Sequence, residues 1–347
     1  MENKPILTVA IPTYNRPHTL EKLLKQFQDE DENKFRILVS DDTSPDDPTN
    51  MVNKYQKVMP NLSYHRNERN LGFSGNVCQL YDMVETPFVW FLCDDDTIVP
   101  GCINEIVDSL EKYDPTVAVY NHSWINPLGL NQVAGVTKDK IYTSENEIKD
   151  YQILMRMTFL STLVLKRILP SDEIRKSDYN SNVFVQVSLG LILLSKEFKY
   201  AEIASLVIKR NVGYKYGDFF KFYVVDSLRA IFGVKHDLNK KGFVNWAIRE
   251  IPTGLQLYLS QKLGIFQYKG WPTKRTIKEI FQYYGIYSLA ILSFIPIYYL
   301  TPTFLLKWLY KRKLYALHGE EKGLKIYNEN INRAYKDERK TGFTEYR

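Results

Sequence analysis

Three consecutive aspartates, Asp94, Asp95 and Asp96, could hold a metal ion. They follow the apolar run at residues 88–92, so we expect a buried strand to present the three carboxylates together at its end. Adjacent carboxylates repel one another, and a hard divalent cation such as Mg²⁺ or Mn²⁺, which binds carboxylate and phosphate oxygens, would relieve that repulsion. A solvated acidic turn capping the helix expected near Pro100 explains the same residues without a metal.

A second pair of carboxylates, Asp41 and Asp42, follows the apolar run at residues 35–39. These side chains could accept hydrogen bonds from a nucleobase or ribose, while a plain N-capping turn at Asp46 or Asp47 is the structural alternative. The loop at residues 70–76, Asn-Leu-Gly-Phe-Ser-Gly-Asn, combines glycines that let backbone approach a ligand with amides that donate and accept hydrogen bonds. Such a loop is compatible with a binding site but not specific to one.

Apolar runs and helical stretches alternate along the first 120 residues. This alternation predicts an α/β domain with a mostly parallel sheet and helices on both faces. Ligands of such sheets bind beyond the carboxyl ends of the strands, so the polar segments after each strand should share one rim. Strands are expected at residues 6–11, 35–39, 62–66, 88–92 and 117–120, and helices at 19–28, 49–59, 74–83 and 100–112.

The periodicity weakens beyond residue 120. We expect a first domain at residues 1–215, made of two halves at 1–125 and 126–215, followed by a mainly helical, aromatic and basic region at 216–347. Within this stretch the sequence predicts a polar excursion at residues 121–140, a helix at 145–159, a strand at 161–166, a buried helix at 183–194 and an edge element at 200–210.

Composition and charge narrow the function classes. The chain has 44% hydrophobic and 25% charged residues, which is typical of a globular protein. Its 3 cysteines form no CxxC pair, which argues against a disulfide framework or a structural zinc site. Residues 1–120 carry 11 basic and 20 acidic residues, and the rest carry 35 and 20. This uneven distribution favours an anionic phospholipid surface over nucleic acid as a partner.

The segment at residues 280–306 contains no charged side chain and is flanked by basic clusters. Its length allows one membrane span, but Pro296, Pro302 and the basic residues on both sides favour a broken helix pair in the headgroup region. A buried helical subdomain is the third alternative. The chain start lacks a signal-peptide pattern. We therefore expect residues 280–313 to attach a peripheral or monotopic protein to the cytoplasmic face of the cell membrane.

Four motifs, in this order, resemble the family 2 glycosyltransferases of the GT-A fold. They are LTVAIPTYN at residues 7–15, ILVSDDTS at 37–44, Asn-Leu-Gly at 70–72 and FLCDDDTIVPG at 91–101. The resemblance covers residues 5–125 closely and 125–210 loosely. It implies that residues 1–215 form a GT-A domain, with a nucleotide-binding half at 1–125 and an acceptor half at 126–215. It implies inverting transfer of a sugar from a nucleotide diphosphate donor to a hydroxyl of a glycan or polyprenyl-linked glycan, in bacterial surface polysaccharide synthesis such as that of O-antigen or capsule.

The resemblance also implies roles for individual residues. Mg²⁺ or Mn²⁺ would be held by Asp95 and Asp96 and would neutralise the leaving diphosphate. The implied donor-binding residues are Thr13, Asn15, Asp41, Asn70, Gly72, Asn76 and Asp94.

Two positions depart from the family pattern. Cys93 stands where the family commonly has aspartate, and residues 184–186, Phe-Val-Gln, stand where it usually has a Glu-Asp pair. An inverting reaction needs a base for the acceptor hydroxyl. Asp178, a loop carboxylate before a helix, is the preferred catalytic candidate, with Asn182 and His122 as the other polar choices.

The sequence lacks the motifs of other nucleotide-binding enzyme classes. A dinucleotide-dependent oxidoreductase or a sugar nucleotidyltransferase would need a glycine-rich turn near residues 12–16, which contain no glycine. The GxxxxGK[ST] motif of P-loop enzymes is absent. The missing Glu-Asp pair leaves a catalytically impaired sugar-nucleotide-binding protein of the same fold as the main alternative, and a membrane scaffold as the third.

Overall fold

A computed structural model describes residues 4–125, 131–168, 184–210, 227–239, 241–246, 249, 278, 281–282 and 300–337. The chain divides into two compact units, one of Met1–Tyr214 with Asp226–Gly242 and one of Lys215–Val225 with Phe243–Arg347. The candidate bases Asp178 and Asn182, and most of the predicted membrane segment at 280–313, lie outside the described residues.

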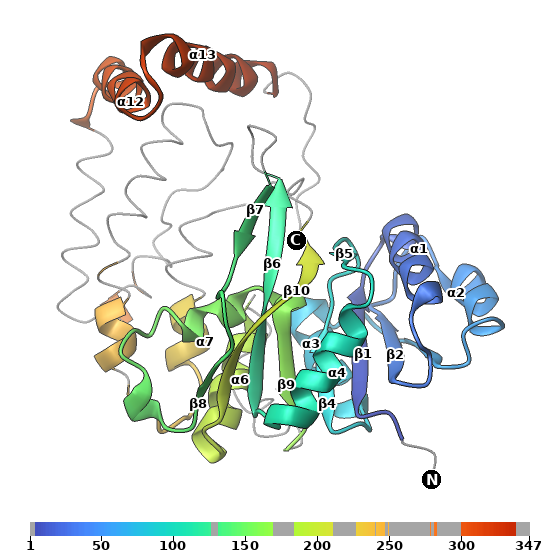
Figure 1. The fold of residues 1–347 in the computed structure, drawn as a ribbon. Coiled ribbons are helices and arrows are strands. Elements are labelled where there is room, and N and C mark those ends of the chain that lie inside the picture. Colours follow the sequence, from blue (N-terminus) through green and yellow to red (C-terminus); the bar gives the residue numbers. More distant parts are fainter. Residues whose placement is uncertain are drawn as a thin grey trace. The chain divides into compact units, whose positions relative to one another are not determined.

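Four parallel strands form one side of the sheet in the first unit, in the order β3-β2-β1-β4 (Figure 1). In the register of these strands, Thr13 pairs with Asp41, and Asp41 pairs with Arg66. The carboxyl ends of three strands therefore lie side by side, as the sequence predicts. The strands are β1 (Leu7–Thr13), β2 (Phe35–Asp41), β3 (Leu62–Arg66) and β4 (Phe88–Phe91).

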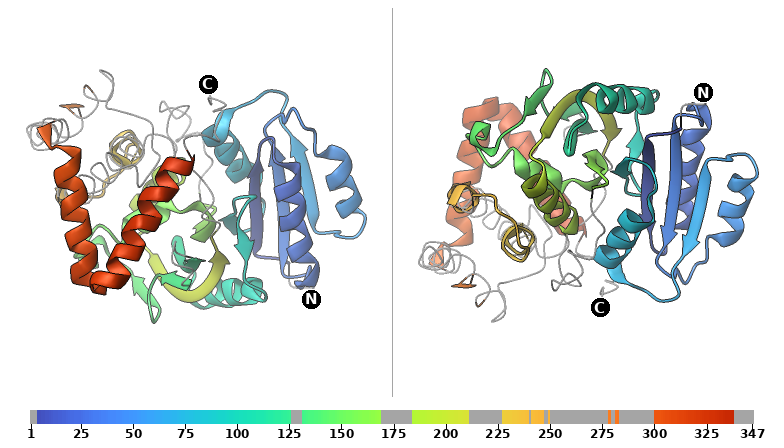
Figure 2. Two further views of the ribbon diagram at one scale, coloured as in Figure 1. Left: turned by 90° about the horizontal axis from the view of Figure 1, so that it is seen from above. Right: turned by 90° about the horizontal axis from the view of Figure 1, so that it is seen from below.

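Helices cover both faces of this half of the sheet. On one face, apolar residues of the first, second and fourth helices share a core cluster with alternate residues of β1 and β2. The third helix contacts β1, β2 and the later helix α6 (Val185–Lys196). The α/β class with helices on both faces is thus confirmed (Figure 2). The four helices are α1 (Pro17–Gln26), α2 (Thr49–Gln56), α3 (Gly72–Met83) and α4 (Cys102–Tyr113), and the short turn η1 (Phe27–Asp29) follows α1.

The other half of the sheet is mixed. The strand β9 (Leu163–Lys166) runs antiparallel between β4 and β6 (Val117–Ile125), and β10 (Tyr200–Lys209) runs parallel to β6. The prediction of an edge element at 200–210 is wrong, because β10 is flanked on both sides. The predicted polar excursion at 121–140 is also wrong in part, since it contains strands. The short flanking strands are β5 (Thr97–Ile98), β7 (Asn131–Ala134) and β8 (Lys140–Tyr142).

The predicted helix at 145–159 is replaced by short 3₁₀ turns. These turns are η2 (Glu145–Glu147), η3 (Leu154–Thr158) and η4 (Leu160–Thr162). In η3, the fully buried Leu154 and Met157 lie three residues apart, one turn of a 3₁₀ helix, and the extended residue Phe159 ends η3 before η4 begins. The hydrogen bond from the hydroxyl of Tyr200 to the carbonyl of Ile153 (2.8 Å) fixes the start of η3.

Two helices close the first unit. The helix α6 is buried along most of its length, in agreement with the predicted buried helix at 183–194. The hydroxyl of Ser188 donates to the carbonyl of Ala230 (2.9 Å) and joins α6 to α7 (Ser227–Phe232).

The second unit contains a helical hairpin of α12 (Thr303–His318) and α13 (Glu320–Asp337), consistent with the expected helical C-terminal region. Gly319 adopts a φ of 77° at the turn, a conformation that favours glycine. The rings of Tyr310 and Tyr327 lie 5.9 Å apart between the two helices. Within the described residues, no helix combines the length and apolar character that crossing a bilayer requires.

Candidate functional site

The rim at the carboxyl ends of β1, β2, β3 and β4 gathers most of the predicted site residues. The backbone continues the sheet contacts past the strands, since the amide of Asp42 donates to the carbonyl of Thr13 (3.0 Å) and the amide of Asn67 to that of Asp41 (2.9 Å). These bonds fix the polar turns against one another. The turns of the rim therefore form one surface joined by hydrogen bonds, and not a set of independent loops.

Asp94 is buried at the base of the acidic run. It accepts hydrogen bonds from the hydroxyl of Thr13 (2.7 Å) and the guanidinium of Arg16 (3.1 Å). Burial raises the pKa of Asp94 to about 6, although Arg16 and Thr13 oppose that rise. Arg16 also lies 3.6 Å from the carboxylate of Asp95. Two carboxylates of the run thus share one cation of the chain.

Asp96 is held by a residue far away in the sequence. The hydroxyl of Ser161, in η4, donates to Asp96 (2.6 Å) and accepts from the amide of Cys93 (3.0 Å). Ligand atoms of Cys93, Asp95 and Asp96 lie within 4.8 Å of one another. Burial of the sulfur, reinforced by Asp96, raises the pKa of Cys93 well above its usual range, so the thiol stays protonated. The carboxylate oxygens of Asp95 and Asp96 remain, and they fit a hard divalent cation.

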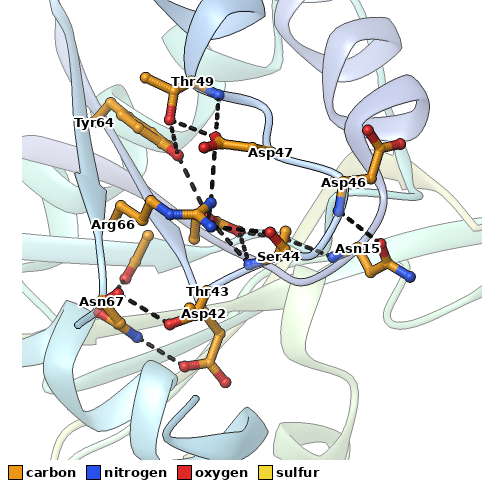
Figure 3. Close-up of polar contacts among 12 residues, drawn as sticks. Asn15, Asp42, Thr43, Ser44, Asp46, Asp47, Thr49, Tyr64, Arg66 and Asn67 are labelled. Carbon is orange, nitrogen blue, oxygen red and sulfur yellow. Dashed lines mark hydrogen bonds and ion pairs between the residues drawn. The ribbon is translucent and has the colours of Figure 1, made fainter. Parts of the chain in front are cut away.

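Asp41 is fully buried and organises the second acidic turn, whose residues Ser44, Asp46 and Asp47 are drawn in Figure 3. Its carboxylate pairs with the guanidinium of Arg66 and accepts hydrogen bonds from the hydroxyl and the amide of Ser44. Arg66 also donates to the carbonyl of Ser44 (3.0 Å) and lies 3.2 Å from Asp47. The amide of Asn15 donates to the hydroxyl of Ser44 (2.7 Å), which connects the first turn of the rim to the second.

Two residues of these turns have strained backbones. Asn15 has a φ of 55° and Thr43 a φ of 64°, and this region is unfavourable for a β-branched residue such as threonine. The hydroxyl of Thr43 donates to the carbonyl of Asn67 (2.9 Å), and Asn15 accepts from the amide of Asp46 (3.3 Å). Each residue in such a conformation costs about 1–3 kcal/mol, so it persists only where surrounding bonds hold it in place. Residues of this kind are concentrated at functional sites.

The loop at residues 70–76 divides into an exposed part and a buried part. Asn70 and Gly72 are exposed, and the amide of Gly72 donates to the side chain of Asn70 (2.9 Å). Asn76 is buried, donates to the carbonyl of Ser40 (3.0 Å) and accepts from its hydroxyl (2.6 Å). The structure thus places Asn76 beneath the rim. The amide of Leu71 donates to the carboxylate of Asp42 (2.7 Å), which keeps Asn70 and Gly72 at the rim. The predicted residues that the structure brings together on the rim are Thr13, Asn15, Asp41, Asn70, Gly72, Asp94, Asp95 and Asp96.

Three residues of the site escaped the sequence prediction. Arg66 could have been found, because it ends a strand next to one that ends in Asp41, and opposite charges there are close neighbours. Arg16 carries a weaker signal, a basic residue in a turn facing an acidic one. Ser161 carries no signal in the sequence, because only the folded position of η4 brings it to Asp96, which is 65 residues earlier in the chain.

His122, one candidate base, lies at the carboxyl-terminal part of β6 in an aromatic setting. Its ring centroid is 4.5 Å from that of Phe159 and 5.7 Å from that of Trp124. Burial lowers the pKa of His122 to about 4, and Arg210 and Arg156 add to the effect. The imidazole is therefore neutral at pH 7 and can accept a proton only weakly.

This pKa predicts a pH dependence of stability. Because the unfolded chain takes up a proton on His122 near pH 6.5 and the folded protein only near pH 4, His122 should lower the free energy of unfolding by about 2 kcal/mol between these values as the pH is lowered. The figure is reduced from the full shift because the ring is partly exposed. In denaturant titrations over this range, the unfolding free energy of the wild type minus that of His122→Gln should therefore fall by about 2 kcal/mol.

The exposed His18 supplies the control for the substitution itself, because His18→Gln should change the unfolding free energy by no more than about 0.5 kcal/mol. Asp94 acts in the opposite direction between about pH 4 and 6, since its raised pKa makes the folded state bind the extra proton, but that contribution is common to all three proteins. Parallel pH profiles for His122→Gln and the wild type would contradict the prediction.

Residues 8–169, a little under half of the chain, match the model of the family described as Glycosyl transferase family 2. All of the rim residues described above lie within this segment. It ends three residues after β9, so it covers the parallel half of the sheet and part of the mixed half.

Several glycosyltransferases share sequence with part of the chain. The GalNAc(5)-diNAcBac-PP-undecaprenol beta-1,3-glucosyltransferase of Campylobacter jejuni is 36% identical over 109 residues, 31% of this chain and 35% of that protein. The processive diacylglycerol beta-glycosyltransferase of Mycoplasma pneumoniae is 27% identical over 119 residues, 33% of this chain and 35% of that protein. The matched part thus spans only about a third of the length of these relatives.

Solved structures of the Staphylococcus aureus protein TarS share the fold. TarS 1–349 aligns with a TM-score of 0.61 at 14% identity, over 98% of this chain and 93% of that one. The same protein in complex with UDP-GlcNAc aligns with a TM-score of 0.57 at 16% identity, over 96% of this chain and 92% of that one. In sequence, the poly(ribitol-phosphate) beta-N-acetylglucosaminyltransferase TarS is 27% identical over 128 residues, 36% of this chain and 22% of that protein.

Proposed function

We propose that the glycosyl transferase family 2 domain at residues 8–169 transfers a hexosyl or deoxyhexosyl group from a nucleotide diphosphate donor to a hydroxyl of a glycan or polyprenyl-linked glycan. The observation that carries the proposal is the convergence of the two acidic turns on one rim. The ion pair with Arg66 fixes the turn at Asp41, where a nucleoside would bind, and the run at Asp94 to Asp96 concentrates negative charge beside that turn.

The relatives support this substrate class. One acts on an undecaprenol-linked glycan by its name, another on diacylglycerol and a third on poly(ribitol-phosphate). Their shared feature is a large or lipid-linked acceptor. We therefore place the reaction in the synthesis of a bacterial surface polysaccharide such as O-antigen or capsule, with the enzyme acting at the cytoplasmic face of the membrane.

The donor side of the rim has the properties that a nucleotide sugar requires. TarS has been crystallised with UDP and with UDP-GlcNAc, which supports a nucleotide sugar as the donor class for this fold. The exposed groups on the rim include Asn15, Asn70 and the backbone of Gly72. Amide side chains donate and accept hydrogen bonds, and a glycine at φ 71° lets a ligand approach the backbone.

In the proposed reaction, an acceptor oxygen forms a bond to the anomeric carbon as the bond from that carbon to the diphosphate oxygen breaks. The acceptor proton passes to a base, and the nucleoside diphosphate leaves with the bonding electron pair. A divalent ion held by Asp95 and Asp96 would neutralise the charge that develops on the diphosphate. Thr13 and Arg16 hold Asp94 in place, and Ser161 orients Asp96, so the acidic run is fixed before the donor arrives.

Asp178 remains our candidate for the base. If it removes the acceptor proton, Asp178→Asn should lower kcat by about 10²-fold or more while donor affinity stays nearly unchanged, since the base contacts the acceptor and not the nucleotide. Single-turnover kinetics with a saturating donor would measure this. An unchanged kcat would transfer the role to Asn182, to His122 or to water, and retained donor hydrolysis in the variant would show that the donor site is intact.

Thermal-shift measurements with a panel of nucleotide sugars, each with and without Mn²⁺, test the donor proposal. The true donor should raise the unfolding temperature in a metal-dependent way, because binding to the native state alone stabilises it. The competing function, a sugar-nucleotide-binding protein without catalysis, would give the same shift. Slow metal-dependent hydrolysis of the identified donor distinguishes the two, because only a working site cleaves the bond. No shift with any donor would refute both.

A further inference from the structure

The helix α12 leaves an apolar stripe exposed. Phe304 is 75% exposed, Trp308 51% and Leu309 48%, and Leu305 lies beside them. These positions are one and four residues apart, so their side chains share one face over the first half of the helix. Leu306 and Leu314, by contrast, are buried. Large exposed apolar groups gathered on one face usually mark a surface that meets a partner.

Basic residues surround and continue this stripe. Between residues 303 and 318 the helix has four lysines and arginines and no acidic residue. Arg312 lies over the ring of Trp308, 4.8 Å from its centroid, so the cationic end directly adjoins the aromatic one. The four are Lys307, Lys311, Arg312 and Lys313.

The neighbouring helix α13 has a different character. Over residues 320–329 it carries Glu320, Glu321 and Glu329 together with Lys322 and Lys325. Its charges are mixed, and Leu324 is a large hydrophobic residue exposed on it. The combination of an aromatic stripe and one sign of charge is therefore a property of α12 and not of the hairpin as a whole.

We propose that α12 docks on an anionic phospholipid bilayer. Phenylalanine, tryptophan and leucine side chains enter the boundary between headgroups and acyl chains, while lysine and arginine side chains reach lipid phosphates. Lys307 lies among the apolar residues and Lys311, Arg312 and Lys313 follow them, so cations are available beside the stripe to reach the headgroups. Leu300, 79% exposed and just before α12, extends the apolar end.

The charge of α12 favours an anionic bilayer over a second copy of the chain as the partner of this face. Two copies meeting through this face would bring two sets of four cations together, and like charges oppose such a contact. An anionic lipid surface supplies the opposite charge over the whole stripe. The proposal stands independently of sugar transfer, since α12 belongs to a different unit of the chain from the candidate active site.

Vesicle flotation with the full chain tests the proposal. Phosphatidylcholine vesicles with and without phosphatidylglycerol are the probes, and the salt concentration is varied. The wild type should float with the anionic vesicles and dissociate as salt rises. The double variant Phe304→Ser/Trp308→Ser and the double variant Arg312→Gln/Lys313→Gln should each lower the partition coefficient by about tenfold or more.

Matched variants on α13 provide the controls. Leu324→Ser removes an exposed leucine and Lys322→Gln/Lys325→Gln removes two exposed lysines, and both should bind vesicles like the wild type. Circular dichroism of each variant establishes that the helices are intact. Failure of the wild type to bind anionic vesicles, or equal losses in the α12 and α13 variants, would overturn the proposal. So would concentration-dependent self-association, measured by sedimentation, that only the α12 variants abolish in protein that does not bind vesicles.

Discussion

Replacing Asp95 with alanine should reduce sugar transfer by about 10³-fold. We expect the loss because Asp95 is the partly exposed carboxylate of the acidic run, available to a metal ion, whereas Asp94 is buried against Thr13 and Arg16. The variant should also lose the Mn²⁺-dependent part of donor affinity, measured by calorimetry. Its unfolding free energy should change little, since the side chain lies on the rim and not in the core.

The exposed Asp46 is the matched control, because it sits on the same rim in the neighbouring acidic turn. Asp46→Ala should keep its metal-dependent donor affinity, which separates a specific ligand from general loss of negative charge. Turnover of Asp95→Ala at the wild-type rate, or full activity of the wild type in EDTA, would rule out the metal proposal.

Removal of Arg66 should produce the largest loss of stability. Arg66→Met leaves the fully buried Asp41 without its cation, and breaking a buried pair from one side typically costs 3–5 kcal/mol. Because the Arg66 side chain is 30% exposed, we expect about 2–3 kcal/mol, which corresponds to about 5–10 °C in unfolding temperature. Denaturant unfolding measures the first quantity and a thermal scan the second.

A double-mutant cycle identifies the cause. Asp41→Asn removes the buried charge, so the double variant Asp41→Asn/Arg66→Met should recover about half of the lost stability and show a clear coupling energy. The exposed Arg69 is the control, and Arg69→Met should change stability by no more than about 0.5 kcal/mol. Strictly additive losses at Asp41 and Arg66 would show that the pair is not coupled.

The parallel half of the fold was predictable because each strand and helix there has a clear local signal. The predicted strand at 62–66 coincides with β3, and the other strands and helices of the first 120 residues were placed within a few residues. The short strand β5 was not predicted, because two residues carry no periodicity. Apolar runs bounded by polar turns, and helices with leucines three and four residues apart such as α1, need no knowledge of distant contacts.

The mixed half resisted prediction for physical reasons. Leu154 and Met157 of η3 lie three positions apart, a spacing that an α-helix also allows, and only the structure shows that the chain forms short 3₁₀ turns there. Likewise, β10 alternates poorly because both of its edges and much of both faces are covered. The candidate site divides in the same way. The acidic turns follow strands and could be found, whereas the partner of Asp96 depends on a contact between segments 65 residues apart.

That contact limits how the chain could be recombined with a related one. Ser161 donates to Asp96 and accepts from Cys93, and its carbonyl accepts from the indole of Trp90 (2.9 Å), so the segment at η4 is fastened to the end of β4 at three points. A chimaera that exchanged everything after β6 for the corresponding region of another protein of this fold would replace η4 and with it all three bonds. Such an exchange would therefore remove the support of Asp96 in the proposed donor site unless the crossover point kept Ser161.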